Sequence, residues 1–551
     1  MAKRFIAESM LFMGFYVSGA AQPVQEIIIS QKQFQIPVLI QMKDNPILRI
    51  KITVPGNNSP EELMGMVFST SGTSALTDIR QARLYYAGND SSKARFGNLE
   101  KATLFGSAGK LSQKTAIEGK QLLPAGDHYF WLSYELNERA DMMHVVDASC
   151  LTVSFVKRTI RPLPEADKLQ QRIGFALRKH MQDSVYTFRI PGITTTKKGT
   201  LLAIYDARRE SSRDLQGDID IGLSRSIDSG NTWEGMRIAM DMGKLGGLPQ
   251  KFNGVSDANI LADEKSGTIF LAGLWMHGVL NGEGKWIENL NENSKEWNHQ
   301  WKAKGSQPGF DVKQTSQFLI VKSTDDGKTW SKPINLTRMC KRENWWLWAP
   351  APGHGITLSD GTLVFPTQGR DDTGKPFSNI TYSKDGGVTW KTSSPADTGS
   401  TTENMAVQLA DGSVMLNMRA NDNKLKKGSD NGRAVAVTTN LGETWQTHPT
   451  SRRALPEPVC MGSIHKHSWL QNGLKKSMLL FANPNSKTGR HHLTIKISFD
   501  DGLTWPEKNW ILLDEWESRG YSCITSIDEH TIGILYESSM SDLVFQKIKI
   551  D

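Results

Sequence analysis

The most regular pattern in this chain is an apolar or alternating run that ends in one short polar turn. The turn reads Ser/Thr-x-Asp-x-Gly-x-Thr-Trp and occurs at residues 226–233, 323–330, 383–390, 438–445 and 498–505. In the fourth copy Asn440 replaces the Asp. The Asp can accept backbone N–H bonds, the Gly supplies a position with positive φ, and the Trp buries a large ring. Each copy therefore predicts a hairpin, and five copies predict repeated antiparallel sheets.

A second repeat predicts the number of those sheets. A turn followed by an apolar run recurs six times, beginning at Gly199, Gly267, Gly361, Gly412, Ser477 and Thr531. Six copies predict six blades, so we expect an all-β fold in which residues 169–551 form a six-bladed β-propeller. That span provides roughly 64 residues per blade, which is enough for four strands and their loops.

The residues before this span lack both repeats. Residues 23–157 contain short alternating strands without a sustained helical period, which predicts a β-sandwich of the jelly-roll type. Residues 158–168 are proline-rich and charged, which is typical of a linker.

Residues 1–22 have the composition of a signal peptide. Lys3 and Arg4 precede an apolar run at residues 10–17, and small residues follow at 18–20, although Glu8 interrupts the pattern. We therefore expect export to the periplasm, the cell surface or the medium, with an ordinary N-terminus as the alternative. Elsewhere the sequence has no apolar stretch long enough to span a membrane.

The composition narrows the choice of partners. Hydrophobic residues make up 38% of the chain and charged residues 22%, with a net charge of +7. No Lys/Arg-dense stripe predicts a nucleic-acid partner, whereas an anionic small ligand or a polyanionic surface fits the mild positive charge. The four cysteines and the neighbouring histidines lack metal-ligand spacing, so we expect buried free thiols, no metal and no cofactor.

Charged residues stand at the ends of the six repeated apolar runs. In a propeller, equivalent strands end on the same face near the central axis, so these residues converge. They are Asp206, Arg208, Arg370, Arg419 and Glu537. Because clustered guanidinium groups repel one another, the three arginines predict an anionic ligand, a carboxylate or a phosphate.

The segment YTFRIPG at residues 186–192 stands just before the first of these runs. Together with the repeated Asp turns, it resembles the Phe/Tyr-Arg-Ile-Pro signature of the sialidases (neuraminidases) over residues 169–551. The chain is most similar to bacterial exo-α-sialidases of the Bacteroidetes type, which also carry an N-terminal β domain. The resemblance implies a glycoside hydrolase that removes terminal sialic acid from glycoproteins, gangliosides or mucin.

The resemblance also assigns a carboxylate-binding triad. Arg189 of the signature corresponds to the first arginine, Arg419 to the second and Arg490 to the third. The chemistry is suitable, because sialic acid carries a carboxylate on its anomeric carbon and guanidinium groups bind carboxylates bidentately.

Three further acidic residues and one arginine take their roles from the same resemblance. Asp214 corresponds to the acid/base, and Glu537 to the acid that holds the first arginine. Arg208 and Asp257 correspond to groups directed at O4 of the sugar. The family has Gly-Asp-Pro around this Asp whereas this chain has Ser-Asp-Ala, so the loop can differ here.

Tyr521 corresponds to the nucleophile of the family and Glu403 to its partner. Most retaining glycosidases use a carboxylate, and sialidases are an exception. A carboxylate nucleophile would be repelled by the carboxylate on the anomeric centre, whereas a neutral phenol is not. The phenol then needs a general base, which Glu403 supplies.

The resemblance further implies that the N-terminal domain is a candidate carbohydrate-binding module. Tyr85, Tyr86, Phe130 and Trp131 offer a sugar platform, but their position inside apolar strands favours a place in the core.

Three alternatives to a hydrolase stay open. A trans-sialidase shares the site, a sialic-acid lectin lacks the catalytic groups, and propellers of unrelated function also carry Asp turns. The preference among α2,3, α2,6 and α2,8 linkages does not follow from the sequence.

Overall fold

The regular secondary structure in the computed structural model of the chain is almost entirely β-strand. The structure describes residues 26–56, 59–90, 99–163, 169–214, 217–245, 250–277, 285, 306–312, 314–397 and 399–550. The signal peptide predicted at residues 1–22 lies outside these ranges. Within them, the short helices lie in connections between strands: α2 (Thr337–Cys340), η1 (Leu76–Asp78), η2 (Leu99–Lys101), η3 (Gln182–Ser184), η5 (Gln250–Phe252), η6 (Asn421–Lys424) and η7 (Glu507–Asn509).

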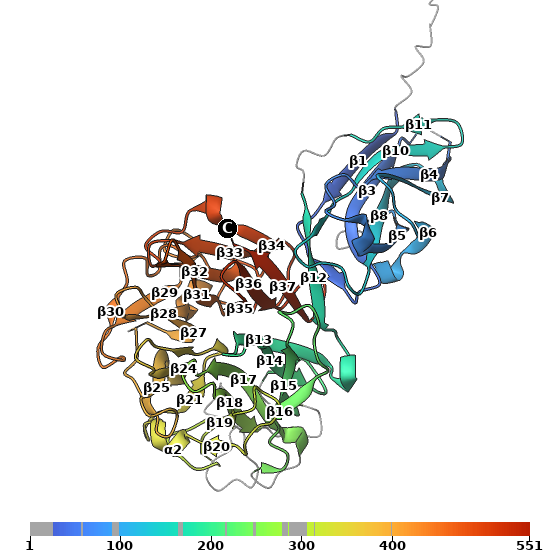
Figure 1. Ribbon diagram of the computed structural model, residues 1–551. Coiled ribbons are helices and arrows are strands. Elements are labelled where there is room, and N and C mark those ends of the chain that lie inside the picture. Colours follow the sequence, from blue (N-terminus) through green and yellow to red (C-terminus); the bar gives the residue numbers. More distant parts are fainter. Residues whose placement is uncertain are drawn as a thin grey trace, which may run out of the picture.

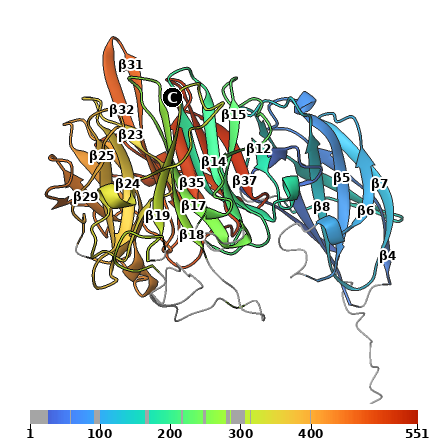
Figure 2. The same ribbon diagram turned by 90° about the horizontal axis from the view of Figure 1, so that it is seen from below.

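Two antiparallel sheets form the N-terminal part of the molecule (Figure 2). The first contains, in spatial order, β1 (Ile28–Gln33), β3 (Asn45–Val54), β8 (Gly126–Leu136), β5 (Ile79–Gly88) and β6 (Thr103–Ala108). The second contains β11 (Thr159–Ile160), β10 (Ser149–Phe155), β4 (Glu61–Ser69) and β7 (Lys114–Leu123). Their apolar faces share one buried cluster, in which Ile50 and Leu132 of the first sheet join Met66 and Ile117 of the second.

The remaining strands form groups arranged around a common centre (Figure 1). The first groups are β13 (Thr187–Thr195), β14 (Leu201–Arg208), β15 (Ile219–Ser226) and β16 (Arg237–Met240), then β17 (Asn253–Ala262), β18 (Ile269–His277), β19 (Gln317–Ser323) and β20 (Ile334–Asn335). One parallel pair, Ile219 with Gly254, joins these two groups into a single sheet.

Three more groups continue the same antiparallel order along the chain. They are β21 (Leu347–Pro350), β24 (Leu363–Arg370), β25 (Pro376–Ser383) and β26 (Lys391–Thr392), then β27 (Thr401–Gln408), β28 (Val414–Ala420), β29 (Ala434–Thr438) and β30 (Gln446–Thr447), and finally β31 (Ser463–Gln471), β32 (Leu474–Pro484), β33 (Leu493–Ser498) and β34 (Ile511–Asp514). The short strands β22 (Gly353–His354) and β23 (Ile356–Thr357) pair with β17 and β24.

The last sheet joins distant parts of the chain. It contains β35 (Ser522–Ser526), β36 (Thr531–Tyr536), β37 (Leu543–Lys549), β12 (Gln171–Arg178) and β2 (Val38–Ile40), with β9 (Val145–Val146) also pairing with β12. Strand β2 runs parallel to β12, and all three of its residues are buried. Strand β2 therefore belongs to this last sheet and not to the two N-terminal sheets. Strand β11 lies within residues 158–168, which the sequence predicts to be a linker.

The repeated Asp turns have the local structure predicted from their sequence. In the second copy the Asp325 carboxylate accepts bonds from the Thr329 backbone N–H at 2.9 Å and from the Thr329 hydroxyl at 2.6 Å. The glycines of the five turns all have positive φ, and they are Gly230, Gly327, Gly387, Gly442 and Gly502. Each turn connects the third strand of a group to the short fourth strand or to the segment in its place.

Two further sequence expectations can be compared with the structure. Phe130 and Trp131 are fully buried and Tyr85 is 8% exposed, so these aromatic side chains belong to the core and do not form a sugar platform. All four cysteines are buried and free, as predicted. A search of the described residues finds no helix with the length and apolar character needed to cross a membrane.

Candidate active site

The predicted nucleophile, Tyr521, immediately precedes β35. Strands β13 and β27 begin at the same end of the central strand groups. The Tyr521 hydroxyl donates a short hydrogen bond to Glu403 Oε1, and Glu403 comes from β27. Arg419 of β28 donates from Nη1 to the other oxygen, Glu403 Oε2, and to the Tyr521 hydroxyl at 3.2 Å. The phenol, the carboxylate and the guanidinium thus form a closed triangle.

Glu537 fixes a second part of the same centre. Its Oε1 accepts bonds from Arg189 Nε and, at 3.0 Å, from the Ile190 backbone N–H. Its Oε2 accepts from Arg189 Nη2 at 3.3 Å and from the Tyr521 backbone N–H at 3.1 Å. One buried carboxylate therefore sets the positions of both the first arginine and the tyrosine.

Local backbone geometry also directs Arg189 into the centre. A β-bulge interrupts the pairing of β13 with β14 between Arg189 and Gly192. Ile190 within it has φ of 59°, which is unusual for a β-branched residue. A bulge re-aims a side chain, and here it accompanies the Arg189–Glu537 contact.

Three guanidinium groups surround the tyrosine ring. The Cζ atoms of Arg189 and Arg490 each lie 5.6 Å from the centroid of the Tyr521 ring, and Arg419 contacts its hydroxyl. Arg490 is held by the Arg519 backbone carbonyl at 2.9 Å. Arg419 Nε is buried and makes no hydrogen bond with the residues that the structure describes, so an unused donor remains in the centre. An anionic ligand would satisfy such donors.

The predicted acid/base lies at the rim. Arg208, the last residue of β14, donates from Nη2 to Asp214 Oδ1 at 2.6 Å and to Asp206 Oδ2 at 3.0 Å. The Asp214 side chain is 64% exposed, whereas that of Arg208 is 2% exposed. Asp206 also accepts from the Ser256 hydroxyl at 2.6 Å. The sequence drew attention to Asp206 only as a strand end, and nothing in it signalled the contact with Ser256.

Asp257 completes the rim from β17. It is 5% exposed and has φ of 54°, and a register shift interrupts the strand pairing beside it. Burial, with the negative charges of Asp214, Glu403 and Asp206, raises its pKa well above the ordinary value, although Arg208 opposes the shift. This environment favours the neutral acid, which can donate a hydrogen bond to a ligand hydroxyl.

Burial and neighbouring charges also determine the protonation states of Tyr521 and Glu537. Burial, reinforced by the negative charge of Glu403, raises the pKa of the Tyr521 phenol well above its ordinary value. Burial also opposes ionisation of Glu537, but Arg189 and two backbone N–H donors outweigh it and lower its pKa. The tyrosine is therefore a neutral phenol, while Glu537 is a fixed negative charge.

The structure brings together most of the residues predicted from the sequence. Contacts connect Tyr521, Glu403 and Arg419, and further contacts join Glu537 and Arg189 to them. Asp214 belongs instead to the neighbouring Arg208 network. Arg370, also predicted to converge, donates to the Gly374 carbonyl in its own loop.

No group of three or more His, Cys, Asp or Glu side chains within the described ranges is arranged to hold a metal ion.

Comparison with known proteins identifies the family of this chain. Residues 26–158 match the N-terminal domain of BNR-repeat neuraminidase, and residues 199–534 match the BNR repeat-like domain. The chain is 39% identical over 540 residues to a sialidase of Bacteroides fragilis (strain YCH46), with 94% of each chain covered. A sialidase of Micromonospora viridifaciens is 31% identical over 362 residues, which cover 64% of this chain and 50% of that protein.

The fold is shared with a solved structure. The Hadza microbial sialidase Hz136 superposes with a TM-score of 0.83 at 36% identity, covering 95% of this chain and 99% of that one. Extensive identity over nearly the whole length, both family matches and the common neuraminidase-type fold agree, and the chain belongs to the sialidases, a family of glycoside hydrolases.

Proposed function

We propose that this sialidase is a retaining exo-α-sialidase that uses Tyr521 as its nucleophile. The observation that carries the proposal is the Tyr521 hydroxyl bonded to Glu403, with three arginines around the ring. The six groups of central strands support a six-bladed β-propeller spanning about residues 169–551. The two sheets before residue 164 support a jelly-roll-like sandwich.

The arginines bind the substrate carboxylate. Arg189, Arg419 and Arg490 present guanidinium groups around the tyrosine, and Arg419 Nε has no hydrogen-bond partner among the described residues. Burial strengthens these charge-assisted hydrogen bonds because water does not screen them. Glu537 keeps Arg189 in place, while Arg208 and Asp257 are available for the O4 side of the sugar.

The first chemical step forms a bond between the tyrosine oxygen and C2 of the sugar. Glu403 accepts the phenolic proton as Tyr521 attacks, and the C2–O bond to the aglycone breaks. Asp214 protonates the departing oxygen, a role that suits its exposed position at the rim. Positive charge develops near C2 in the oxocarbenium-like transition state of this step, next to the negative charge that develops on the tyrosine oxygen.

The second step reverses these roles. Asp214, now ionised, takes a proton from water, which attacks C2 and breaks the bond to the tyrosine oxygen. Glu403 returns its proton to the phenolate. Two inversions at C2 give sialic acid with the configuration of the substrate.

The substrates proposed are the terminal sialic acids of glycoproteins, gangliosides or mucin. With the signal-like residues 1–22, we infer that the enzyme acts in the periplasm, at the cell surface or outside the cell.

Release of 4-methylumbelliferone from its α-sialoside tests the proposal. The wild-type chain should turn over, and Tyr521→Phe should reduce turnover by about 10³-fold or more. Tyr536→Phe is a matched control, because Tyr536 is also buried and its hydroxyl donates to Gln546 rather than to Glu403. Nearly intact activity in Tyr521→Phe would contradict the nucleophile assignment, and a wild type that binds without turnover would indicate a lectin.

A further inference from the structure

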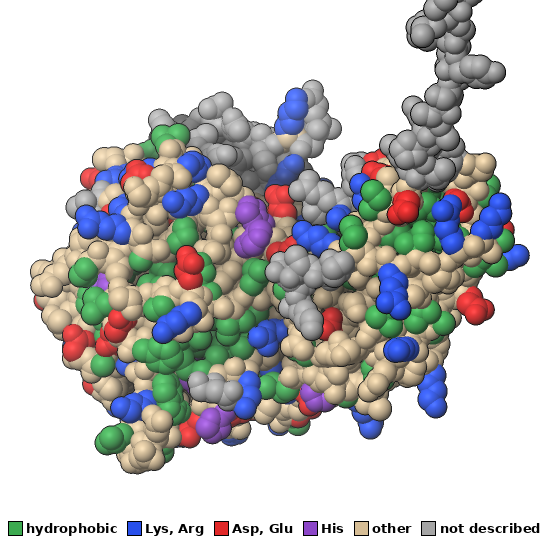
Figure 3. All heavy atoms as spheres, turned by 90° about the horizontal axis from the view of Figure 1, so that it is seen from above, with side chains coloured by type: hydrophobic (Ala, Val, Ile, Leu, Met, Phe, Trp, Pro, Cys, Tyr) green, Lys and Arg blue, Asp and Glu red, His purple; other side chains and the backbone are tan. Residues whose placement is uncertain are grey.

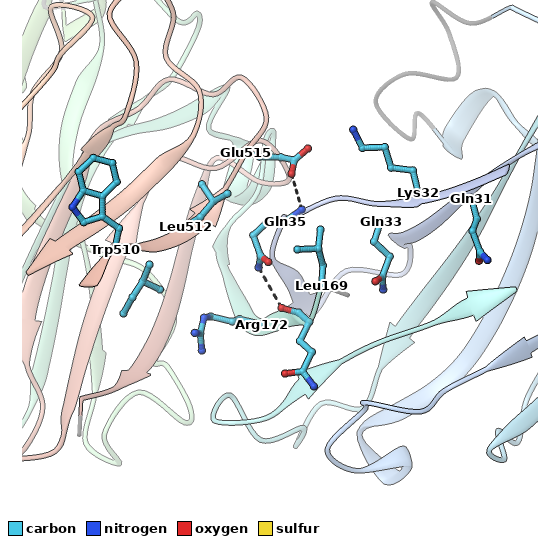
Figure 4. A pocket seen from close by; sticks show the side chains of 11 residues that line it. Gln31, Lys32, Gln33, Gln35, Leu169, Arg172, Trp510, Leu512 and Glu515 are labelled. Atoms are coloured by element: carbon cyan, nitrogen blue, oxygen red, sulfur yellow. Dashed lines mark hydrogen bonds between the residues drawn. The ribbon is translucent and has the colours of Figure 1, made fainter. Parts of the chain in front are cut away.

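A cleft lies between the N-terminal sheets and the β33–β34 edge, separate from the residues of the active site. It has a volume of about 670 Å³, within the range of small-ligand sites. Its walls come from three parts of the chain: β1 and the segment after it, the start of β12, and the segment before and within β34 (Figure 4).

Arg172 on β12 is the unusual residue of this cleft. Its guanidinium makes no hydrogen bond or ion pair within the parts of the chain that the structure describes, and burial lowers its pKa. In Figure 4 it points to the side of Trp510 and away from the Glu515 carboxylate. An unpaired, half-buried guanidinium is unfavourable, and an anion in the cleft would relieve this.

The acid of the cleft is already engaged. Glu515 Oε2 accepts from the Gln35 backbone N–H at 3.0 Å, and the Glu515 backbone N–H donates to the Gln35 carbonyl at 2.8 Å. These two bonds join the two parts of the molecule. Lys32 is exposed at the same cleft. The cleft therefore has two cations, Arg172 and Lys32, and one carboxylate, Glu515, which already accepts a hydrogen bond from Gln35. The balance of charge favours a negatively charged ligand.

The other lining residues fit a sugar. Gln31, Gln35 and Gln170 contribute amide groups near the surface, and Trp510 contributes a half-buried indole. The indole N–H already donates to the Trp505 carbonyl at 3.1 Å, and Lys496 Nζ lies over the ring at 5.3 Å from its centroid, so the face away from Lys496 is the one left for a ligand. An aromatic surface next to hydrogen-bonding amides and a cation suits a saccharide that carries one acidic group.

We propose that this cleft binds an acidic saccharide, with Arg172 holding the carboxylate or sulfate and Trp510 packing against the sugar ring. The site would hold the enzyme on an anionic glycan while the catalytic centre, elsewhere on the molecule, acts on sialic acid. The proposal does not depend on the roles assigned to Tyr521, Glu403 or Asp214.

Titration calorimetry on the full-length chain tests this site, with 3′-sulfolactose and methyl β-glucuronide as acidic probes and lactose as the neutral control. Arg172→Gln should weaken binding of at least one acidic probe about tenfold or more, as expected when one charge-assisted contact is lost. Trp510→Ala should weaken it as well, and lactose should bind poorly. The two acidic probes separate a sulfate from a carboxylate ligand.

Arg419→Gln is the matched control, since it removes an arginine from the catalytic centre and leaves the cleft intact. Binding that is lost in Arg419→Gln but unchanged in Arg172→Gln would overturn the proposal, because the probe would then occupy only the catalytic centre. Lactose binding as tightly as the acidic probes would also overturn it. Unchanged kcat/KM for the small α-sialoside would show that Arg172→Gln is folded.

Discussion

The Tyr521 hydroxyl donates a hydrogen bond to Glu403, which lies 118 positions earlier in the sequence. Tyr521 immediately precedes β35, and Glu403 lies near the start of β27. Arg419 contacts both groups, so in the proposed mechanism the phenolic proton would leave beside a fixed positive charge. This charge would stabilise the phenolate, while burial and Glu403 favour the neutral phenol and raise its pKa.

Replacing Glu403 with Gln should leave the tyrosine in place but remove its base. We expect kcat to fall by about 10²–10⁴-fold, the usual contribution of general acid–base catalysis. Steady-state kinetics with the α-sialoside provide the measurement. Glu443→Gln is the control, since Glu443 is exposed in the fourth Asp turn. Equal kcat in the two variants would show that Glu403 is not the base.

Arg490→Lys should mainly affect substrate binding. Lysine keeps the charge but cannot form the bidentate contact of a guanidinium. A loss of about 1.5–3 kcal/mol, typical of a hydrogen bond to a charged group, raises KM by about 10- to 150-fold. A drop in kcat alone, at constant KM, would contradict a carboxylate-binding role for Arg490.

Asp206 should make stability depend on pH. Burial, with the charge of Asp214, raises its pKa to about 6, against the opposing effect of Arg208 and Ser256. Its protonated form is thus favoured on folding, and the resulting stability is lost as the pH rises from about 4 to about 6. The shift corresponds to about 3 kcal/mol.

Asp206→Asn removes this titration. In urea unfolding, the free energy of the wild type should decrease relative to that of the variant by about 2 kcal/mol between about pH 4 and about pH 6. If the two free energies change in parallel over this interval, Asp206 does not titrate as described.

The fourth Asp turn offers a test of the repeat. Asn440 Oδ1 accepts from the Thr444 backbone N–H at 3.1 Å, whereas Asp500 accepts the equivalent bond in the fifth turn at 2.9 Å. A carboxylate makes the stronger, charge-assisted bond, so Asn440→Asp should raise the free energy of unfolding by about 0.5–1 kcal/mol. Asp500→Asn should lower it, and shifts of the opposite sign would contradict this reading of the turn.

The sequence predicted the features that depend on neighbouring residues. Each Asp turn contains its own carboxylate, its positive-φ glycine and its hydrogen-bond donors within eight residues, so the motif alone was sufficient. The repeated apolar runs likewise became β14, β18, β24, β28, β32 and β36. The candidate site residues were predicted because the resemblance to sialidases supplied their positions along the chain, and the structure brings several of them into contact.

Features that depend on distant pairing were missed. Strand β2 pairs with β12, more than 130 positions later, and its short apolar run resembles any other buried strand. The Asp206–Ser256 bond depends on how two neighbouring groups of strands are placed within one sheet. Figure 3 shows basic and acidic side chains interspersed over one face. In such a mixture the sequence alone does not tell which arginine, such as Arg172, lies apart from the acidic residues.

Covalent trapping tests the central claim most directly. The wild-type chain is incubated with 2,3-difluorosialic acid, whose C2–F bond breaks as the nucleophile attacks, and is then digested for mass spectrometry. The account predicts a fluorosialyl group on the Tyr521 side chain and none in Tyr521→Phe. A label on Glu403 or Asp214, or inactivation without any label on Tyr521, would contradict it.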